Sequence, residues 1–266
     1  MILKNKVVIV TGIGPGLGIK LALCAALEGA AGVVLASRST EKLERAVSQI
    51  AELSPTTEVL AIPTDICDEA QCQSLVTATL DRFGRIDALV NSAYEHGKFE
   101  SIEHADLAVW RSVMETNLIG TMQLTKAVVP AMKTQGGGAI VMINTQATRK
   151  PVVLEMGGES GYAASKAALA NTVKYLALEL GKYGIRVNSA FMGWMWGEPV
   201  QNYVRYQAHK SGISEQEVIA GVARHIPLGK ISTDEDCAKA AMFLVSDYAN
   251  AVTGASLDIN GGEYMP

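Results

Sequence analysis

The chain has 266 residues, about half of them apolar, and a formal net charge of −4. This length suits one large α/β domain, and the charges are scattered without a basic face, so we expect no nucleic acid and no membrane surface among its partners. No apolar run approaches the roughly 18 residues that a membrane-spanning helix needs, and no leader-like stretch precedes the first apolar run, so cytoplasmic residence is the expectation.

Four cysteines and four histidines are spread along the chain. The cysteines form no C-x-x-C pair, and the histidines are too scattered to suggest metal ligands. We therefore expect reduced, mostly buried thiols and no metal site.

Short β-branched runs alternate with longer segments of helical periodicity. The expected strands lie at 7–12, 32–37, 58–65, 86–93, 138–145, 185–192 and 256–260. The expected helices lie at 17–29, 39–53, 68–83, 106–133, 161–183 and 234–246. Continuously apolar strands between helices predict a single doubly wound α/β domain over residues 1–266, with a central parallel sheet covered by helices on both faces. Residues 194–226 look irregular, and we expect a substrate lid there.

A glycine-rich turn, TGIGPGLG (11–18), stands between the first expected strand and the first expected helix. Glycines let the backbone turn sharply and come close to a ligand, and the N–H groups at the start of a helix attract an anion. No Gly-Lys-Ser/Thr follows, so the turn is not a P-loop. Its position predicts a nucleotide phosphate site. The residues expected to contact the nucleotide there are Gly12, Gly14, Pro15, Gly16, Leu17 and Gly18.

Arg38 follows the second expected strand, where the adenosine ribose of a nicotinamide dinucleotide lies on such a sheet. No acidic residue is present to bind a free 2′-hydroxyl, whereas Ser37 and Arg38 suit a 2′-phosphate. We therefore favour NADP(H) as cofactor, with NAD(H) as the alternative if Arg38 only stacks on adenine or is solvated. Asp65 ends the third strand, where it is expected either to accept from the adenine amino group or to cap the next helix.

Tyr162 and Lys166 lie four positions apart in an expected helix and so share one face. A phenol loses its proton near pH 10 in water, and an ammonium beside it favours the phenolate. We expect Lys166 to lower the pKa of Tyr162 toward working pH, so that the tyrosine can exchange a proton with an alcohol or carbonyl oxygen. Lys166 is also expected to reach the nicotinamide ribose.

Motifs in a fixed order over nearly the whole chain resemble those of the short-chain dehydrogenase/reductase family. They are TGIGPGLG (11–18), DI (65–66), LVNSA (89–93), METNLIGT (114–121), YAASK (162–166), RVNS (186–189), VTG (252–254) and DINGG (258–262). The resemblance implies a Rossmann-type fold and an NAD(P)-dependent oxidoreductase. It also implies a homotetramer formed through the two long helices and the C-terminal strand.

The resemblance further implies roles for particular residues. Tyr162 would be the general acid/base, and Lys166 would lower its pKa and hold the ribose. Asn117 would interrupt its helix and help to hold a water behind the lysine. The remaining residues expected to bind or support the cofactor are Ile66, Asn91, Ser92, Ala93, Gly193 and Met195.

Family members usually carry two serines after the fifth strand, and the second one binds the substrate oxygen. Asn144 and Thr145 hold those places here, and we expect the Thr145 hydroxyl to bind the oxygen, with the Gln146 amide as the alternative. The segment from Thr145 to Tyr162 is longer than usual by about four residues. The longer segment is expected to bring three charged residues near the pocket mouth, where they either face the pocket or are simply solvated charges of the loop. They are Arg149, Lys150 and Glu155.

Two further departures from the family pattern bear on the substrate. Tyr94 stands where glycine is usual, and the stretch MGWMWG (192–197) lacks the usual Pro and Thr. The alternative for the aromatic side chains is ordinary packing within the lid. The residues expected to form an apolar, aromatic pocket are Tyr94, Val152, Met156, Met192, Trp194, Trp196 and Tyr203. Such a pocket favours a fairly bulky, uncharged ketone or secondary alcohol, although Arg149 or Lys150 could instead recruit an acidic substrate.

The expected activity is therefore the NADP(H)-dependent interconversion of a small-molecule ketone and a secondary alcohol. One alternative is an NAD-dependent alcohol dehydrogenase of the same fold. Two others are a non-catalytic dinucleotide sensor that keeps the fold and an enzyme that performs epimerisation or dehydration.

Overall fold

A parallel sheet forms the centre of the computed structural model, which describes residues 1–154 and 157–266. Its strand order is β3-β2-β1-β4-β5-β8-β9, and every neighbouring pair is parallel. The strands are β1 (Val7–Thr11), β2 (Gly32–Ser37), β3 (Glu58–Pro63), β4 (Ala88–Asn91), β5 (Gly138–Thr145), β8 (Ile185–Met192) and β9 (Ser256–Ile259). All seven predicted strands are confirmed, with ends shifted by no more than two residues.

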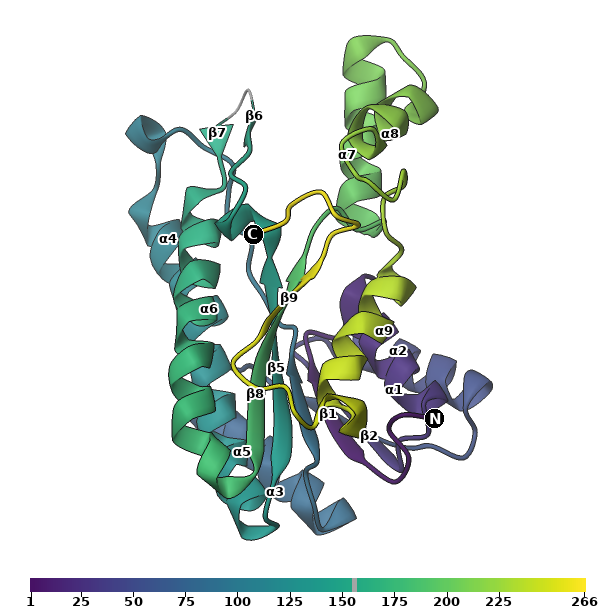
Figure 1. The fold of residues 1–266 in the computed structure, drawn as a ribbon, viewed down its shortest axis with the longest axis vertical. Coiled ribbons are helices and arrows are strands. Elements are labelled where there is room, and N and C mark those ends of the chain that lie inside the picture. Colours follow the sequence, from purple (N-terminus) through teal and green to yellow (C-terminus); the bar gives the residue numbers. More distant parts are fainter. Residues whose placement is uncertain (155–156) are drawn as a thin grey trace.

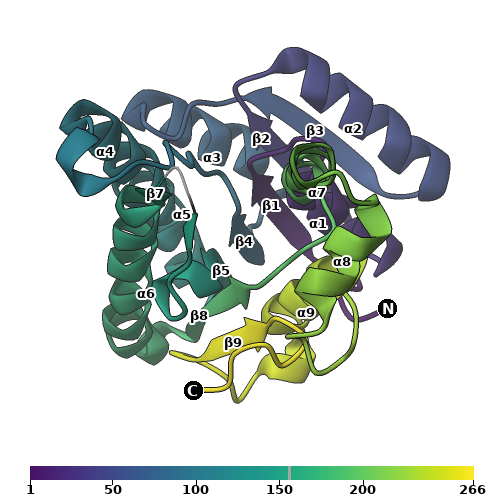
Figure 2. The same cartoon turned by 90° about the horizontal axis from the view of Figure 1, so that it is seen from above.

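Helices cover both faces of this sheet, as predicted (Figures 1 and 2). The first face carries α1 (Leu17–Leu27), α2 (Thr40–Leu53) and α9 (Asp234–Val245), and the second carries α3 (Glu69–Phe83), α5 (Thr121–Thr134) and α6 (Ser160–Leu180). Because side chains of a strand alternate between faces, Val8 and Val10 of β1 enter the core under the first set of helices, and Ile9 enters the core under the second.

The strand order reverses at β1, which pairs with β2 on one side and with β4 on the other. In open parallel sheets, ligands bind beyond the carboxyl ends of the strands at this reversal. The loops that follow β1 and β4 are therefore expected to form a ligand-binding site.

The predicted helix 106–133 is not continuous. It consists of α4 (Leu107–Met114), a wider π-helical turn (Glu115–Gly120) and α5. The side chain of Asn117 points out of this wider turn into the protein, where it is fully buried. Single π turns within helices are frequent at functional sites.

The expectation of irregular structure over 194–226 is wrong, because two helices occupy most of it: α7 (Glu198–Ser211) and α8 (Glu215–Ala223). Local signals explain both. Gly212 ends α7 in a left-handed conformation, and Ser214 with Glu217 forms a capping box that begins α8. Both helices stand above the carboxyl end of the sheet (Figure 1).

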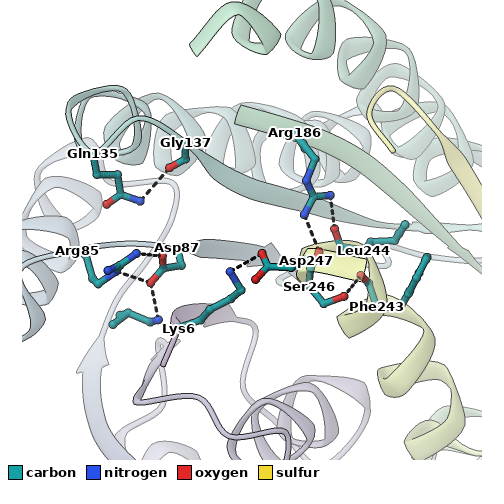
Figure 3. Close-up of polar contacts among 11 residues, drawn as sticks. Lys6, Arg85, Asp87, Gln135, Gly137, Arg186, Phe243, Leu244, Ser246 and Asp247 are labelled. Atoms are coloured by element: carbon teal, nitrogen blue, oxygen red, sulfur yellow. Dashed lines mark hydrogen bonds and ion pairs between the residues drawn. The ribbon is translucent and has the colours of Figure 1, made fainter. Parts of the chain in front are cut away.

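The amino end of the sheet is closed by a network of polar side chains (Figure 3). Asp87 accepts a hydrogen bond of 2.8 Å from the N–H of Val7 and pairs with Arg85 at 2.5 Å. Arg186 donates to the carbonyl oxygens of Leu244 and Ser246 at 2.8 and 2.9 Å. These contacts tie β1, β4 and β8 to their neighbours at the edge away from the predicted site.

No helix within residues 1–154 and 157–266 is both long and apolar enough to cross a membrane. The cysteines Cys24, Cys67, Cys72 and Cys237 are free thiols. Burial raises the pKa of Cys24 and of Cys72 to about 11, so these thiols are protonated near neutral pH and are weak nucleophiles.

Candidate active site

A cavity of about 950 Å³ opens at the carboxyl end of the sheet. It extends from the glycine turn after β1, past the ends of β2 and β4, to the start of α6. The predicted site residues that line it are Gly12, Gly14, Pro15, Gly16, Leu17, Gly18, Ser37, Arg38, Asp65, Ile66, Ser92, Ala93, Tyr94, Thr145, Gln146, Val152, Tyr162, Lys166, Met192, Gly193, Trp194, Met195 and Tyr203. The predicted phosphate turn and the predicted tyrosine and lysine therefore share one cavity.

The glycine turn fits the close approach of a phosphate. Gly12 has a φ of 73°, and a Cβ there would lie 2.6 Å from the backbone nitrogen of Ala93. A Cβ on Gly18 would collide with the carbonyl oxygen of Gly12. Gly16 is the N-cap of α1, and neither a capping side chain nor an acidic residue in the first turn occupies the N–H groups there. These groups are available to an anion, so the residues fit the diphosphate of a dinucleotide.

The far end of the cavity, beyond β2, is basic. Arg38 lines it as predicted, and so does Lys42 in the first turn of α2, which the sequence analysis did not single out. Asp65 accepts a hydrogen bond from the N–H of Cys67 at 3.0 Å, whereas the N-cap of α3 is Asp68. The alternative of Asp65 as the helix cap is therefore wrong.

Lys166 is buried, and its ammonium nitrogen donates to the carbonyl oxygen of Ile143 at 2.8 Å. This bond ties α6 to the end of β5. Burial lowers the pKa of Lys166 to about 7, because a charged ammonium loses its hydration there. Both protonation states are therefore present near neutral pH.

The pKa of Tyr162 moves in the direction opposite to the prediction. Enclosure of the phenol raises it above the ordinary value, and the neighbouring Tyr94 and Glu159 add to the rise. A hydrogen bond with the Thr145 side chain acts in the opposite direction but is the smaller effect. In the protein by itself, the loss of hydration outweighs any help that Lys166 gives to the phenolate.

Thr145 and Gln146 have different partners. The Thr145 side chain is close enough to Tyr162 to lower the pKa of the phenol slightly, and its hydroxyl oxygen accepts from the N–H of Ala147 at 3.2 Å. The Gln146 amide nitrogen donates to Glu263 at 2.9 Å. Thr145 is thus the residue whose hydroxyl lies beside the phenol, while the amide of Gln146 is already engaged.

Asn117 and Asn91 do not line the cavity but support it from beneath. The Asn117 amide donates to Ser165 at 2.9 Å and to the carbonyl oxygen of Glu95 at 2.8 Å, and its oxygen accepts from the Glu95 N–H at 2.7 Å. Asn91 donates to Thr125 at 3.2 Å. Asn117 therefore fixes both the helix that carries Tyr162 and the chain segment that follows β4.

Other aromatic rings lie close to the ring of Tyr162. The ring centroids of Tyr94 and His96 lie 6.1 and 4.7 Å from that of Tyr162, and Phe99 lies 4.8 Å from His96. In the segment 194–226, the ring centroid of Trp194 lies 5.4 Å from that of Tyr203.

The substrate pocket was also predicted to involve Trp196, Met156 and Glu155. Trp196 does not line the cavity, because its ring packs on the small apolar cluster between α7 and α8. That prediction is wrong. Met156 and Glu155 lie outside the described residues.

The two inserted cations are paired within the protein. Arg149 contacts Asp258 at 2.5 Å, and its guanidinium lies 3.7 Å from the centre of the Phe191 ring. Lys150 contacts the buried carboxylate of Glu263 at 2.8 Å. Arg149 does not line the cavity, and the charge of Lys150 is balanced. The alternative in which they recruit an acidic substrate loses its support.

The sequence analysis missed several residues that line the cavity. They are Lys42, His96, Phe99, Glu159 and Glu263. The position of His96 in the sequence could have predicted its place at the site. It follows the fourth strand closely, and the carboxyl ends of parallel strands meet at one edge of the sheet. Glu263 had none, since the path of the last residues is set by contacts with residues more than 100 positions away.

The chain is similar to characterised oxidoreductases over almost its full length. Residues 12–263 match a family model described as enoyl-(acyl carrier protein) reductase. Levodione reductase of Leifsonia aquatica is 34% identical, over 97% of this chain and 94% of its own. Several other matching proteins are named short-chain dehydrogenases/reductases.

Two solved structures are similar in fold and contain a dinucleotide. L-sorbose reductase of Gluconobacter frateurii, complexed with NADPH and L-sorbose, has a TM-score of 0.90 at 28% identity and covers 99% of this chain and 98% of its own. A 7α-hydroxysteroid dehydrogenase, complexed with NADH and a bile acid ketone, has a TM-score of 0.83 at 30% identity and covers 98% of this chain and 94% of its own.

Proposed function

This chain belongs to the short-chain dehydrogenase/reductase family and is an NAD(P)-dependent oxidoreductase, and we propose that it interconverts a fairly bulky ketone and the matching secondary alcohol with NADP(H). The observation that carries the proposal is that Tyr162, Thr145 and Lys166 line the same cavity as the glycine turn, with Lys166 one helical turn from Tyr162.

Tyr162 and Thr145 are suited to hold the oxygen of the reacting group. The dinucleotide, when bound, supplies or accepts the hydride. As a ketone is reduced, negative charge develops on its oxygen, and the Thr145 hydroxyl stabilises that charge with a hydrogen bond. Tyr162 donates the proton that completes the alcohol, and it takes a proton back in the reverse reaction. In this proposal Lys166, anchored on Ile143, contributes positive charge and holds the ribose.

The choice of NADP(H) rests on the basic end of the cavity. Arg38 and Lys42 are two exposed cations next to the predicted ribose position. A guanidinium and an ammonium together suit a phosphate, whereas a free 2′-hydroxyl is normally bound by an acidic residue. NAD(H) is the alternative, because both side chains are free to turn into solvent.

The aromatic lining supports a fairly bulky substrate. Tyr94, Phe99, Trp194 and Tyr203 all line the cavity and bring aromatic rings to it. Trp194, Tyr203 and neighbouring residues of the segment 194–226 reach the cavity from above, and this supports the proposal that the segment is a lid.

The oligomeric state stays a proposal as well. Several large apolar side chains on α4, the π turn and α6 are exposed: Leu107, Ile119, Tyr175 and Leu178. They lie on the two predicted long helices and support assembly into a homotetramer through that face. Light scattering of the wild type and of Leu178→Glu tests it, and a monomeric wild type would refute it. Cytoplasmic residence remains a prediction.

A parallel screen of ketones and secondary alcohols with NADPH, NADP⁺, NADH and NAD⁺ tests the proposal. We expect at least one ketone to be reduced, with kcat/KM at least tenfold higher for NADPH than for NADH. Tight dinucleotide binding without turnover of any compound would favour the sensor alternative. Product formation without net change in dinucleotide absorbance would favour epimerisation or dehydration.

A further inference from the structure

We propose that His96, held by Glu159, is a specificity-determining residue that binds a hydroxyl group on the carbon next to the reacting carbonyl, so that the preferred substrates are α-hydroxyketones and the matching vicinal diols. This inference rests on the proposed function and names its substrate class more narrowly. It follows from a histidine and a carboxylate in the cavity that the proposed proton transfer does not use.

The His96 ring lies directly against the ring of Tyr162. Their centroids are 4.7 Å apart, with an interplanar angle of 28°. Both residues line the cavity. In the proposed function the Tyr162 hydroxyl holds the reacting oxygen, so the imidazole is placed to meet a second oxygen that is only one carbon further along the substrate.

Glu159 fixes the orientation of His96. Its carboxylate lies 2.8 Å from the Nε2 atom, and both side chains are partly buried. A carboxylate can only accept hydrogen bonds, so Nε2 carries a proton in this pair. In the neutral imidazole, Nδ1 is then an acceptor, and within the described part of the chain it has no hydrogen-bond partner. An acceptor at this position matches the O–H donor of a hydroxyl group.

The backbone before His96 is held as firmly as its side chain. Both backbone polar groups of Glu95 are bonded to Asn117, at 2.7 and 2.8 Å. Phe99 packs on the side of the imidazole with a centroid distance of 4.8 Å. A site that fixes its acceptor in advance gains more from a matching donor, because little ordering is left to be done on binding.

The charges around the pocket favour a neutral hydroxyl over an anion. Glu159 and Glu263 both line the cavity, and the nearby cation Lys150 is paired with Glu263. A substrate carboxylate at His96 would lie close to the carboxylate of Glu159, which holds the imidazole, and would be repelled by it. A hydroxyl next to the carbonyl meets the acceptor without that repulsion.

The test uses matched ketones that differ by a hydroxyl in place of a methyl group. The pairs are 2-hydroxycyclohexanone with 2-methylcyclohexanone, 3-hydroxy-2-butanone with 3-methyl-2-butanone, and 2-hydroxyacetophenone with propiophenone. The full-length enzyme is assayed with NADPH, and kcat/KM is compared within each pair. We expect the hydroxyketone to be preferred at least tenfold in the pair that fits best, because a buried hydrogen bond discriminates by about that factor.

His96→Phe keeps a ring against Tyr162 and Phe99 but removes both nitrogens. It should lower kcat/KM for the hydroxyketone alone. The ratio of kcat/KM for the hydroxyketone to that for its methyl counterpart should therefore fall to near one. The matched control is His104→Phe in the same chain segment, since His104 is exposed and does not line the cavity. This control should keep the wild-type ratio.

Two outcomes overturn the inference while the proposed function stands. One is a wild type that reduces the methyl ketones as well as the hydroxyketones. The other is a His96→Phe variant that lowers both members of a pair equally, because this indicates a role in packing on Tyr162. If no ketone of any pair is reduced, the proposed function fails and the inference falls with it.

Discussion

The two ends of the central sheet differ in whether their polar side chains have hydrogen-bond partners within the protein. At the amino end, the buried carboxylate of Asp87 accepts from the backbone N–H of Val7, and the partly buried Arg186 donates to carbonyl oxygens of neighbouring elements (Figure 3). At the carboxyl end, the buried side-chain oxygens of Asn144 and Gln146 have no hydrogen-bond partner in the described part of the chain.

This difference separates stability from function. A buried polar group that is fully paired contributes to the free energy of unfolding, whereas an unpaired one costs free energy until a ligand binds it. Lys166 lies at the carboxyl end, and its lowered pKa shows that burying its charge costs free energy. We therefore expect substitutions at the carboxyl end to change catalysis and those at the amino end to change stability.

The largest expected effect is the loss of turnover in Tyr162→Phe. Removing the phenol hydroxyl removes the proton donor, so kcat should fall by about 10²–10⁴-fold. The midpoint of urea unfolding should stay the same or rise. Steady-state kinetics and urea titration of the same preparation measure both quantities. If Tyr162→Phe keeps its redox turnover, the proposed chemistry is wrong.

The second prediction concerns how the free energy of unfolding of Lys166→Met depends on pH, compared with that of the wild type. In the wild type, the folded state releases the Lys166 proton near pH 7, whereas the unfolded chain keeps it to about pH 10.5. The unfolded state therefore binds more protons between these values, and this lysine makes the free energy of unfolding rise with pH there, by on the order of 1 kcal/mol per pH unit.

The variant should lose that rise and be more stable than the wild type near pH 6, while its kcat falls strongly. Urea titrations at several pH values from 6 to 9 measure the difference between the two proteins. The cysteine thiols titrate alike in both proteins and cancel in that difference. An equal pH dependence for both would show that Lys166 stays charged in the folded protein.

Asp87→Ala should lower the stability of the protein and leave its catalysis unchanged, in contrast to the substitutions at the carboxyl end. It leaves the Val7 N–H without its buried acceptor and the Arg85 guanidinium without its partner. We expect the free energy of unfolding to fall by about 2 kcal/mol, mostly from the buried N–H, because Arg85 is half-exposed. KM and kcat below the unfolding range should be unchanged. A large loss of kcat in a folded variant would contradict the expectation that the amino end affects stability but not catalysis.

The smallest of these effects concerns the cofactor. Arg38→Asp should weaken NADP⁺ use by more than tenfold and affect NAD⁺ use little, because it replaces a phosphate partner by a partner for a free hydroxyl. Lys42→Ala should produce a weaker effect in the same direction. Measuring kcat/KM with both dinucleotides checks this, and an unchanged preference would discard the phosphate assignment.

Much of the fold and part of the site could be predicted from the residues. The buried β-branched runs and the glycine turn are local signals, and each depends on residues close together in the chain. Tyr162 and Lys166 are likewise one helical turn apart. The helices α7 and α8 escaped prediction because apolar residues such as Val204 and Val218 pack in a small cluster of their own rather than on the main core.

The remaining errors concern contacts between distant segments. The partner of Arg149 is Asp258, 109 positions away, and nothing in the local pattern pairs them. The pKa of Tyr162 depends on how completely its surroundings exclude water, which spacing along a helix does not reveal. Trp196 shows the same limit, because a tryptophan next to a pocket can equally well pack away from it.

The π turn at Glu115–Gly120 makes the chain length critical at this point. In a regular helix each residue advances the rotation by about 100°, so a deletion here would turn Asn117 and the whole apolar side of α5 relative to each other. Either Leu124 and Val128 would leave the core, or Asn117 would lose Glu95 and Ser165. A substitution at the exposed Glu115 keeps this rotation unchanged, whereas the gain or loss of a single codon alters it.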